Sequence, residues 1–225
     1  AANAAMMKGV WTFTDAAGTG ILRVGDNGEY VTAITDAPSG TGRPGFEYGR
    51  LEVNSAGKLS RQIVLDADGS SGLSHFDFAS TVAVTGTRFT TTLNGVTQGF
   101  DGRLPDPGTG IVGMWAIGSP TDLKVTQFVF FANGKVLSIH PAETEGACAT
   151  ARLGPPGIEW SDYSFNAATG ALRIFNKIYD TSGCTGVFDP TGTVPITEAN
   201  LVLTMAADGK TFTVPVDGGT VTLTG

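Results

Sequence analysis

The feature that most constrains the fold is a set of short motifs that occurs twice, in the same order, along the 225-residue chain. The motifs are Gly-x-Trp, Asn-Gly, Pro-Gly-x-Glu followed by an aromatic residue, and Asp-x-x-Gly-x-x-Gly. They begin at Gly9, Asn27, Pro44 and Asp66 and return at Gly113, Asn133, Pro156 and Asp180. The offset grows from 104 to 114 residues while the order is kept. This predicts one ancestral module that has been duplicated.

A cluster of proline, glycine and aspartate over residues 101–110 marks the seam between the copies, because these residues favour turns over a strand ladder. We therefore expect an N-terminal tail over residues 1–7, a first module over 8–106 and a second module over 107–225. Each module is long enough to bury a core of its own.

Strand-forming residues alternate with turn signals throughout the chain. Glycine is abundant, with 32 residues, and charged residues make up 16% of the chain. Runs rich in Thr and Val, of about five to nine residues, are separated by Asn-Gly, Asp-Gly and Pro-Gly turns. The pattern predicts an all-β protein of two tandem, homologous up-and-down antiparallel β-barrels, each of about eight strands. β-Sandwiches are the alternative, because period-two patterning does not separate the two architectures.

The acidic balance restricts the classes of partner. A formal net charge of −7 argues against nucleic acid and anionic membrane surfaces, which are bound by clustered Lys and Arg. No apolar run reaches the roughly 18 to 20 residues of a membrane-spanning helix, so no membrane span is expected. The opening AANAAMM is typical of what remains after a signal segment is removed. We expect a secreted, periplasmic or cell-surface protein.

The two cysteines, Cys148 and Cys184, lack the spacing and the accompanying histidines of a zinc site. A disulfide in a secreted protein is the interpretation we favour, and two unpaired thiols are the alternative. The bridge would tie an insertion of the second module to its Asp-x-x-Gly turn.

These motifs carry two resemblances. Gly-x-Trp at the start of about eight meandering strands resembles barrels of the lipocalin and avidin type, which implies an interior that can hold a small apolar ligand. The complete order of motifs resembles repeat modules of bacterial secreted proteins and lipoproteins that are described as adhesin-like. This second resemblance implies an extracellular location more than an activity.

The glutamate of each Pro-Gly-x-Glu motif is a candidate site residue. Counting in steps of two from Glu47 and Glu159 gives the face of each strand that becomes apolar, so both carboxylates are expected at a barrel mouth or just inside it. The structural interpretation is that each accepts hydrogen bonds from turn amides or pairs with an arginine such as Arg23 or Arg173. The alternative is a ligand site, whose predicted residues are Glu47, Glu159, Trp11, Trp115, Tyr163 and Phe165.

The first Asp motif resembles a cation loop in part. Asp66, Asp68 and Ser70 alternate oxygen-bearing side chains, but the glycine at the fourth position and the missing distal glutamate depart from an EF-hand. In the second copy Ser182 and Cys184 replace Asp68 and Ser70. We expect a plain turn held by Asx hydrogen bonds, with a weak Ca²⁺ site in the first module as the alternative and no other cofactor.

The sequence carries no motif of hydrolytic or nucleotide chemistry. His75 and His140 occupy non-equivalent places in the two copies, and the two glutamates belong to separate modules, so we predict no catalytic residues and no enzyme activity. We expect a non-catalytic extracellular or cell-surface module that acts through protein contact, as an adhesin-like domain or an assembly subunit. Residues 1–7 are the candidate segment for self-association by strand donation. The alternative is a lipocalin-like carrier of a small apolar ligand.

Overall fold

The computed structural model describes residues 4–15, 18–35, 44–69, 73, 81–100, 102–103, 110–122, 124–141, 156–182, 186–188, 196–216 and 219–225. Over these residues the protein is all-β, as predicted, with one short 3-10 helix, η1 (Ala4–Met7). The chain divides into two compact units, unit 1 (Ala1–Leu104) and unit 2 (Pro105–Gly225). Ser70, His75, Cys148 and Cys184 lie outside the described residues, so the disulfide and the Ser70 ligand remain predictions.

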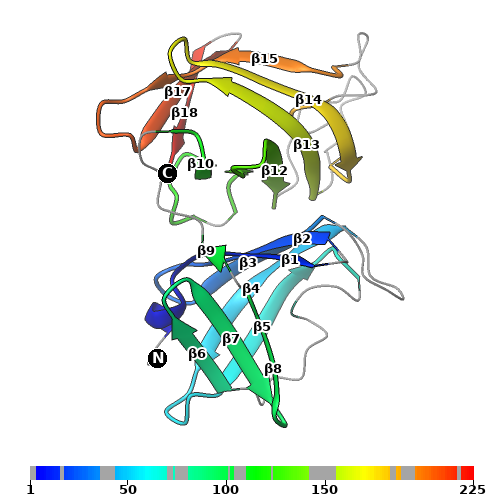
Figure 1. Ribbon diagram of the computed structural model, residues 1–225, viewed down its shortest axis with the longest axis vertical. Coiled ribbons are helices and arrows are strands. Elements are labelled where there is room, and N and C mark those ends of the chain that lie inside the picture. The colour runs from blue at the N-terminus through cyan, green and yellow to red at the C-terminus, as the bar shows by residue number, and fades with distance from the viewer. Residues whose placement is uncertain are drawn as a thin grey trace. The chain divides into compact units, whose positions relative to one another are not determined.

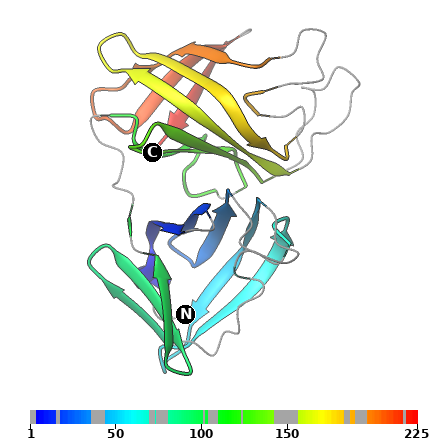
Figure 2. The same cartoon turned by 45° about the vertical axis from the view of Figure 1, so that its right-hand side comes forward.

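Unit 1 contains two antiparallel sheets. The larger has the order β5-β4-β3-β2-β1-β9 and the smaller the order β6-β7-β8. The strands are β1 (Gly9–Asp15), β2 (Gly18–Val24), β3 (Glu29–Ile34), β4 (Gly45–Val53), β5 (Leu59–Asp66), β6 (Thr81–Thr85), β7 (Arg88–Leu93), β8 (Val96–Phe100) and β9 (Gly102–Arg103). Figures 1 and 2 show β6, β7 and β8 as a separate layer beside the larger sheet.

The two sheets of unit 1 differ from the single eight-stranded barrel expected for this half. An isolated bridge between Lys58 and Thr81 joins them next to the start of β5 and β6. Over the described residues, one bridge thus joins the residue before β5 to the first residue of β6, where a barrel needs a continuous ladder.

Unit 2 is a single nine-stranded sheet that is barrel-like. Its order is β15-β14-β13-β12-β11-β10-β18-β17-β16, and its two end strands, β15 and β16, are separated in the chain by Leu203 alone. The sheet therefore curls back on itself and is nearly closed (Figure 1). The strands are β10 (Gly113–Ile117), β11 (Gln127–Phe130), β12 (Lys135–His140), β13 (Gly157–Asn166), β14 (Ala171–Asp180), β15 (Ala199–Val202), β16 (Thr204–Met205), β17 (Thr211–Val216) and β18 (Gly219–Thr224).

From Glu47 onward, burial along β4 follows the period of two that the sequence predicts, whereas Phe46 on the opposite face is also buried. Glu47, Leu51 and Val53 are buried, whereas Arg50 and Glu52 are exposed. The face counted from Glu47 is therefore the inner face of unit 1, as expected from the alternation.

The register of the β4–β5 and β13–β14 ladders places a glutamate opposite an aspartate in both units. Glu47 pairs with Asp66, and Glu159 pairs with Asp180. In each ladder the register shifts just beyond the residue that follows the glutamate. Such a shift bends the strand and increases its twist, which turns the glutamate end of the hairpin relative to the rest.

The core of unit 1 centres on Trp11, whose side chain is fully buried. Its ring lies 5.7 Å from that of Phe89 in β7, so both sheets of unit 1 share one core. The Trp11 Nε1–H donates to the backbone oxygen of Met7 at 2.7 Å, and Met7 is itself fully buried. The sequence placed Met7 in a tail, whereas η1 ends inside this core.

The core of unit 2 centres on Trp115 in the same manner. The Trp115 Nε1–H donates to the backbone oxygen of Ile111 at 2.7 Å, and its ring lies 4.2 Å from that of Phe212 in β17. Within the described part of the chain, no helix has the length and apolar character needed to cross a bilayer.

Candidate functional site

The first element of the candidate site is a turn that crosses the Pro-Gly motif after β5. A Cβ atom at Gly45 would lie 2.4 Å from the backbone oxygen of Ala67 and 3.0 Å from the Cα atom of Asp68. The Ala67 N–H donates to the backbone oxygen of Phe46 at 2.9 Å, which fixes the turn against β4. Because position 45 has no side chain, Asp68 reaches the side of Glu47.

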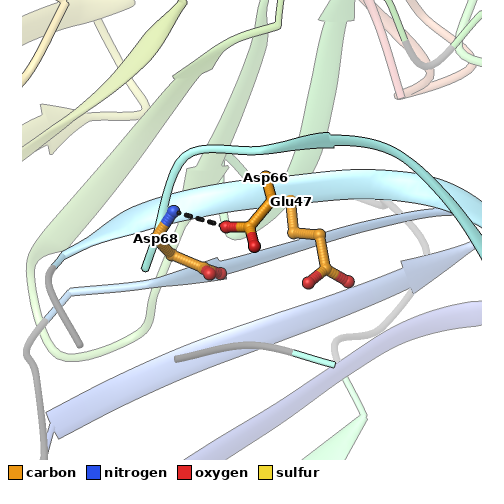
Figure 3. Close-up of side chains that lie close together, drawn as sticks. All are labelled: Glu47, Asp66 and Asp68. Carbon is orange, nitrogen blue, oxygen red and sulfur yellow. Dashed lines mark hydrogen bonds between the residues drawn. The ribbon is translucent and has the colours of Figure 1, made fainter. Parts of the chain in front are cut away.

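Three carboxylates meet at this crossing. One oxygen each of Glu47, Asp66 and Asp68 lies within 4.8 Å of the other two (Figure 3). Glu47 and Asp68 are fully buried, whereas Asp66 is exposed. The Asp68 N–H donates to Asp66 Oδ1 at 3.2 Å, which is the Asx-type bond expected for this turn. Glu47 and the pair of aspartates belong to two separate sequence motifs, and the structure brings them together.

Asp68 is the unusual member of this group. Neither of its carboxylate oxygens has a hydrogen-bond partner among the described residues, although its side chain is completely buried. Burial, followed by the contact of its side chain with that of Asp66 and by the negative charge of Glu47, raises the pKa of Asp68 to about 8. A buried carboxylate without a donor is unstable as an isolated anion, so Asp68 is either protonated or accompanied by a cation.

Tyr30 in β3 holds the neighbouring glutamate. Its hydroxyl donates to Glu47 Oε1, and both side chains are fully buried. Burial and this hydrogen bond raise the pKa of Tyr30, so the phenol keeps its proton and stays a donor, while the Arg61 cation lowers the same pKa. Sequence reasoning missed Tyr30. The repeat contained a signal for this residue. The offset of 106 residues set by the Asn-Gly turns aligns Tyr30 with Val136, so the first module has a hydroxyl where the second has an apolar side chain.

The corresponding glutamate of unit 2 has different partners. Glu159 accepts hydrogen bonds from the backbone N–H groups of Val187 and Phe188 at 2.8 and 2.9 Å, as the structural interpretation expected. A Cβ atom at Gly186 would lie 2.5 Å from this carboxylate. His140 is buried, and its Nε2 atom lies 3.5 Å from Glu159 Oε2. Backbone amides thus satisfy the carboxylate of Glu159, whereas the Tyr30 hydroxyl bonds the carboxylate of Glu47 in unit 1.

The turn of unit 2 carries Ser182 at the place of Asp68. A Cβ atom at Gly157 would lie 2.6 Å from the Ser182 backbone nitrogen, so this turn also crosses the Pro-Gly motif. The Ser182 N–H and hydroxyl donate to Asp180 Oδ1 at 2.9 and 3.1 Å. This version of the turn therefore has a satisfied side chain where unit 1 has an unsatisfied carboxylate.

The remaining residues of the predicted ligand site belong to the hydrophobic cores or pack against them. Trp11 and Trp115 are buried core residues. Tyr163 donates its hydroxyl to the backbone oxygen of Phe131 at 2.8 Å, and Phe165 packs on the unit 2 core. Arg173, one of the expected partners of Glu159, forms an ion pair with Glu198 at 2.6 Å instead.

A scan of the sequence against protein-family models found no match, and a search of curated proteins found no significant similarity.

Proposed function

We propose that the protein is a non-catalytic module that acts through contact between its surface and other proteins, as an adhesin-like domain or a subunit of an extracellular assembly. The observation that carries the proposal is the packing of aromatic rings in the core of unit 2. Among the described residues, Trp115 and Phe212 lie 4.2 Å apart, and Phe130 and Tyr163 lie 5.0 Å apart in an edge-to-face contact. A small barrel either fills with side chains or holds a ligand, and this packing supports the first state over a carrier.

The engagement of the two glutamates supports the non-catalytic part of the proposal. Glu47 lies in unit 1 and is bound by Tyr30, whereas Glu159 lies in unit 2 and is bound by two backbone amides. A mechanism that used the two glutamates as its carboxylate pair would need both of them in one site, roughly 5 to 9.5 Å apart. Each glutamate is used inside its own unit.

Matching details support the view that both units are variants of one duplicated barrel module. In each unit the tryptophan Nε1–H donates to the carbonyl four residues earlier, at 2.7 Å. In each unit the glutamate also faces the aspartate across the same hairpin. The resemblance to repeat modules of bacterial secreted proteins supports a secreted, periplasmic or cell-surface location. Met7, the last residue of the segment 1–7, is buried in the core of its own unit, so self-association by strand donation is proposed only for the residues before it.

Ligand occupancy of the interior tests this proposal against the carrier alternative. Native mass spectrometry of protein from its source is expected to show the bare chain mass, and an apolar fluorescent probe is expected not to bind stoichiometrically. Phe212→Ala is the matched control, because deleting a buried ring opens a dry cavity that can accept a small apolar molecule. A stoichiometric apolar ligand in the unsubstituted protein would contradict the proposal and favour the carrier.

Self-association of this chain is one way in which it could act as an assembly subunit, and it can be tested without a second protein. Val64 in β5 and Val202 in β15 are 60% and 55% exposed, and they are suitable positions for a disruptive charge. We expect sedimentation velocity to show mass rising with concentration, and Val64→Lys or Val202→Lys to reduce that rise without changing the unfolding midpoint. A chain that stays monomeric at every concentration would remove the assembly-subunit form.

A further inference from the structure

We propose that Glu47, Asp66 and Asp68 of unit 1 form a binding site for one divalent cation of the calcium type. The site is independent of the contact function proposed above, so either proposal can fail without the other. Its basis is the meeting of three carboxylates whose oxygens lie within 4.8 Å of one another. Acidic side chains often gather without binding a metal, and the state of Asp68 distinguishes this cluster from such cases.

Asp68 supplies the independent indication of a ligand. Its side chain is 0% exposed, it points into the cluster, and neither carboxylate oxygen has a hydrogen-bond partner among the described residues (Figure 3). Buried polar groups in native proteins are nearly always satisfied by protein, water or an ion. A cation shared with Glu47 and Asp66 would satisfy both oxygens and offset the repulsion among the three carboxylates.

Unit 2 acts as an internal comparison. Its turn crosses the Pro-Gly motif in the same way, and its aspartate accepts the same backbone hydrogen bond. There, however, Ser182 bonds Asp180, and Glu159 is bound by two backbone amides. The equivalent place in unit 2 thus has no third carboxylate and no unsatisfied oxygen among its described residues. The turn itself does not require the buried charge of Asp68.

The donor set selects the class of cation. All three side chains offer carboxylate oxygens, the hard ligands preferred by Ca²⁺ and Mg²⁺, and the cluster has no nitrogen or sulfur ligand to favour zinc or copper. Ca²⁺ takes oxygens at about 2.3 to 2.6 Å in flexible geometry, so two ligands across the ion can lie nearly 5 Å apart. Mg²⁺ needs shorter, octahedral bonds and keeps several waters, which suits a partly buried cluster less well.

The surroundings allow a cation to enter and be held. Asp66 is exposed, so the cluster reaches the surface through this residue while Glu47 and Asp68 remain buried. Tyr30 donates to one oxygen of Glu47 and so orients that ligand. Arg61 lies close enough to act electrostatically on Tyr30. A bound cation would therefore lie in the same region as the positive charge of Arg61.

Calorimetry on the full chain, stripped with a chelator and titrated with CaCl₂, tests the proposal. We expect one Ca²⁺ per chain, with tenfold or weaker affinity for Mg²⁺. Asp68→Ser, which copies the side chain of unit 2, and Glu47→Gln are expected to lower the Ca²⁺ affinity at least tenfold. Asp26→Asn is the control, because Asp26 is an exposed carboxylate paired with Lys8 in the same unit. The Ca²⁺ affinity of this variant should equal that of the unsubstituted protein.

A second measurement locates the ion. Tb³⁺ replaces Ca²⁺ at oxygen sites and is excited by a nearby aromatic ring, so Tyr30 should sensitise its emission. Tyr30→Phe is expected to reduce that emission several-fold.

Three results would overturn the proposal. The first is no binding up to about 10 mM Ca²⁺, a concentration well above the range of weak extracellular sites. The others are an unchanged Ca²⁺ affinity in Asp68→Ser and tighter binding of Mg²⁺ than of Ca²⁺. Misfolding of Asp68→Ser is a small risk, since the variant removes a buried carboxyl group whose oxygens have no partner among the described residues. A metal-free unfolding midpoint at or above that of the parent protein is the check.

Discussion

Asp68 of unit 1 and Ser182 of unit 2 occupy the same place in two matching turns, each with its backbone N–H bonded to the aspartate two residues earlier, at 3.2 and 2.9 Å. The serine hydroxyl bonds that aspartate as well, whereas both oxygens of Asp68 lack a partner among the described residues. The two units therefore share a backbone arrangement and differ in the charge buried beneath it. This difference separates a structural turn from a candidate binding site.

The glycine of each Pro-Gly motif is expected to be essential for the crossing turn. Gly45→Ala and Gly157→Ala would place a methyl group 2.4 and 2.6 Å from backbone atoms that cannot rotate away. Each is expected to lower the free energy of unfolding by about 1 to 3 kcal/mol, as overpacking does. Urea denaturation measures the loss. The control is Gly110→Ala, where a methyl group meets nothing within 4 Å, and a large loss in that variant would argue against the steric explanation.

The hydrogen bond from Tyr30 to Glu47 is expected to stabilise unit 1. Tyr30→Phe removes the hydroxyl donor to a fully buried carboxylate, and the expected loss of unfolding free energy is about 1 to 3 kcal/mol. Tyr163→Phe is the matched variant in unit 2, because the Tyr163 hydroxyl bonds a neutral backbone oxygen in a half-buried place. It should lose less, about 0.5 to 1.5 kcal/mol. Equal losses would show that the charge of Glu47 is unimportant.

The Arg173–Glu198 pair gives a prediction of pH dependence. The hydrogen bond from Arg173, followed by that from Asn200, lowers the pKa of Glu198 to about 2. Because the folded pKa lies below the unfolded one, the pair stabilises the folded state above about pH 4, and that stabilisation is lost as the pH falls toward 2. NMR titration of the Glu198 side chain should show the low pKa, a large rise in Arg173→Met and a smaller rise in Asn200→Ala. An unchanged pKa in Arg173→Met would contradict this assignment.

Several features of the fold were predictable because they depend on local pattern. Alternation counted from Glu47 identified the buried face of β4, and the repeat of Gly-x-Trp identified Trp11 and Trp115 as matching positions of the two units. The split of unit 1 into two sheets was not predictable in this way. It depends on how far β5 and β6 pair, and period-two patterning carries no information about that ladder.

The candidate site was predictable only in pieces. Asp66 and Asp68 were recognisable as candidate oxygen ligands from their spacing, and Glu47 stood out through its repeated motif. Their meeting depends on the β4–β5 register and on a chain crossing at Gly45, which lies more than 20 residues before the two aspartates in sequence. Tyr30 lies on a third strand, so its bond to Glu47 depends on sheet order as well. Short-range patterns do not encode such contacts.

The central claim is that unit 1 binds a cation at its carboxylate cluster whereas the matching place in unit 2 is satisfied by the protein itself. Backbone amide NMR spectra of the full chain, recorded with and without Ca²⁺, test it most directly. The account predicts shifts concentrated at residues 45–48 and 66–69, with residues 157–160 and 180–182 unchanged. Shifts of equal size at both sets of residues, or no shifts at either set, would contradict it.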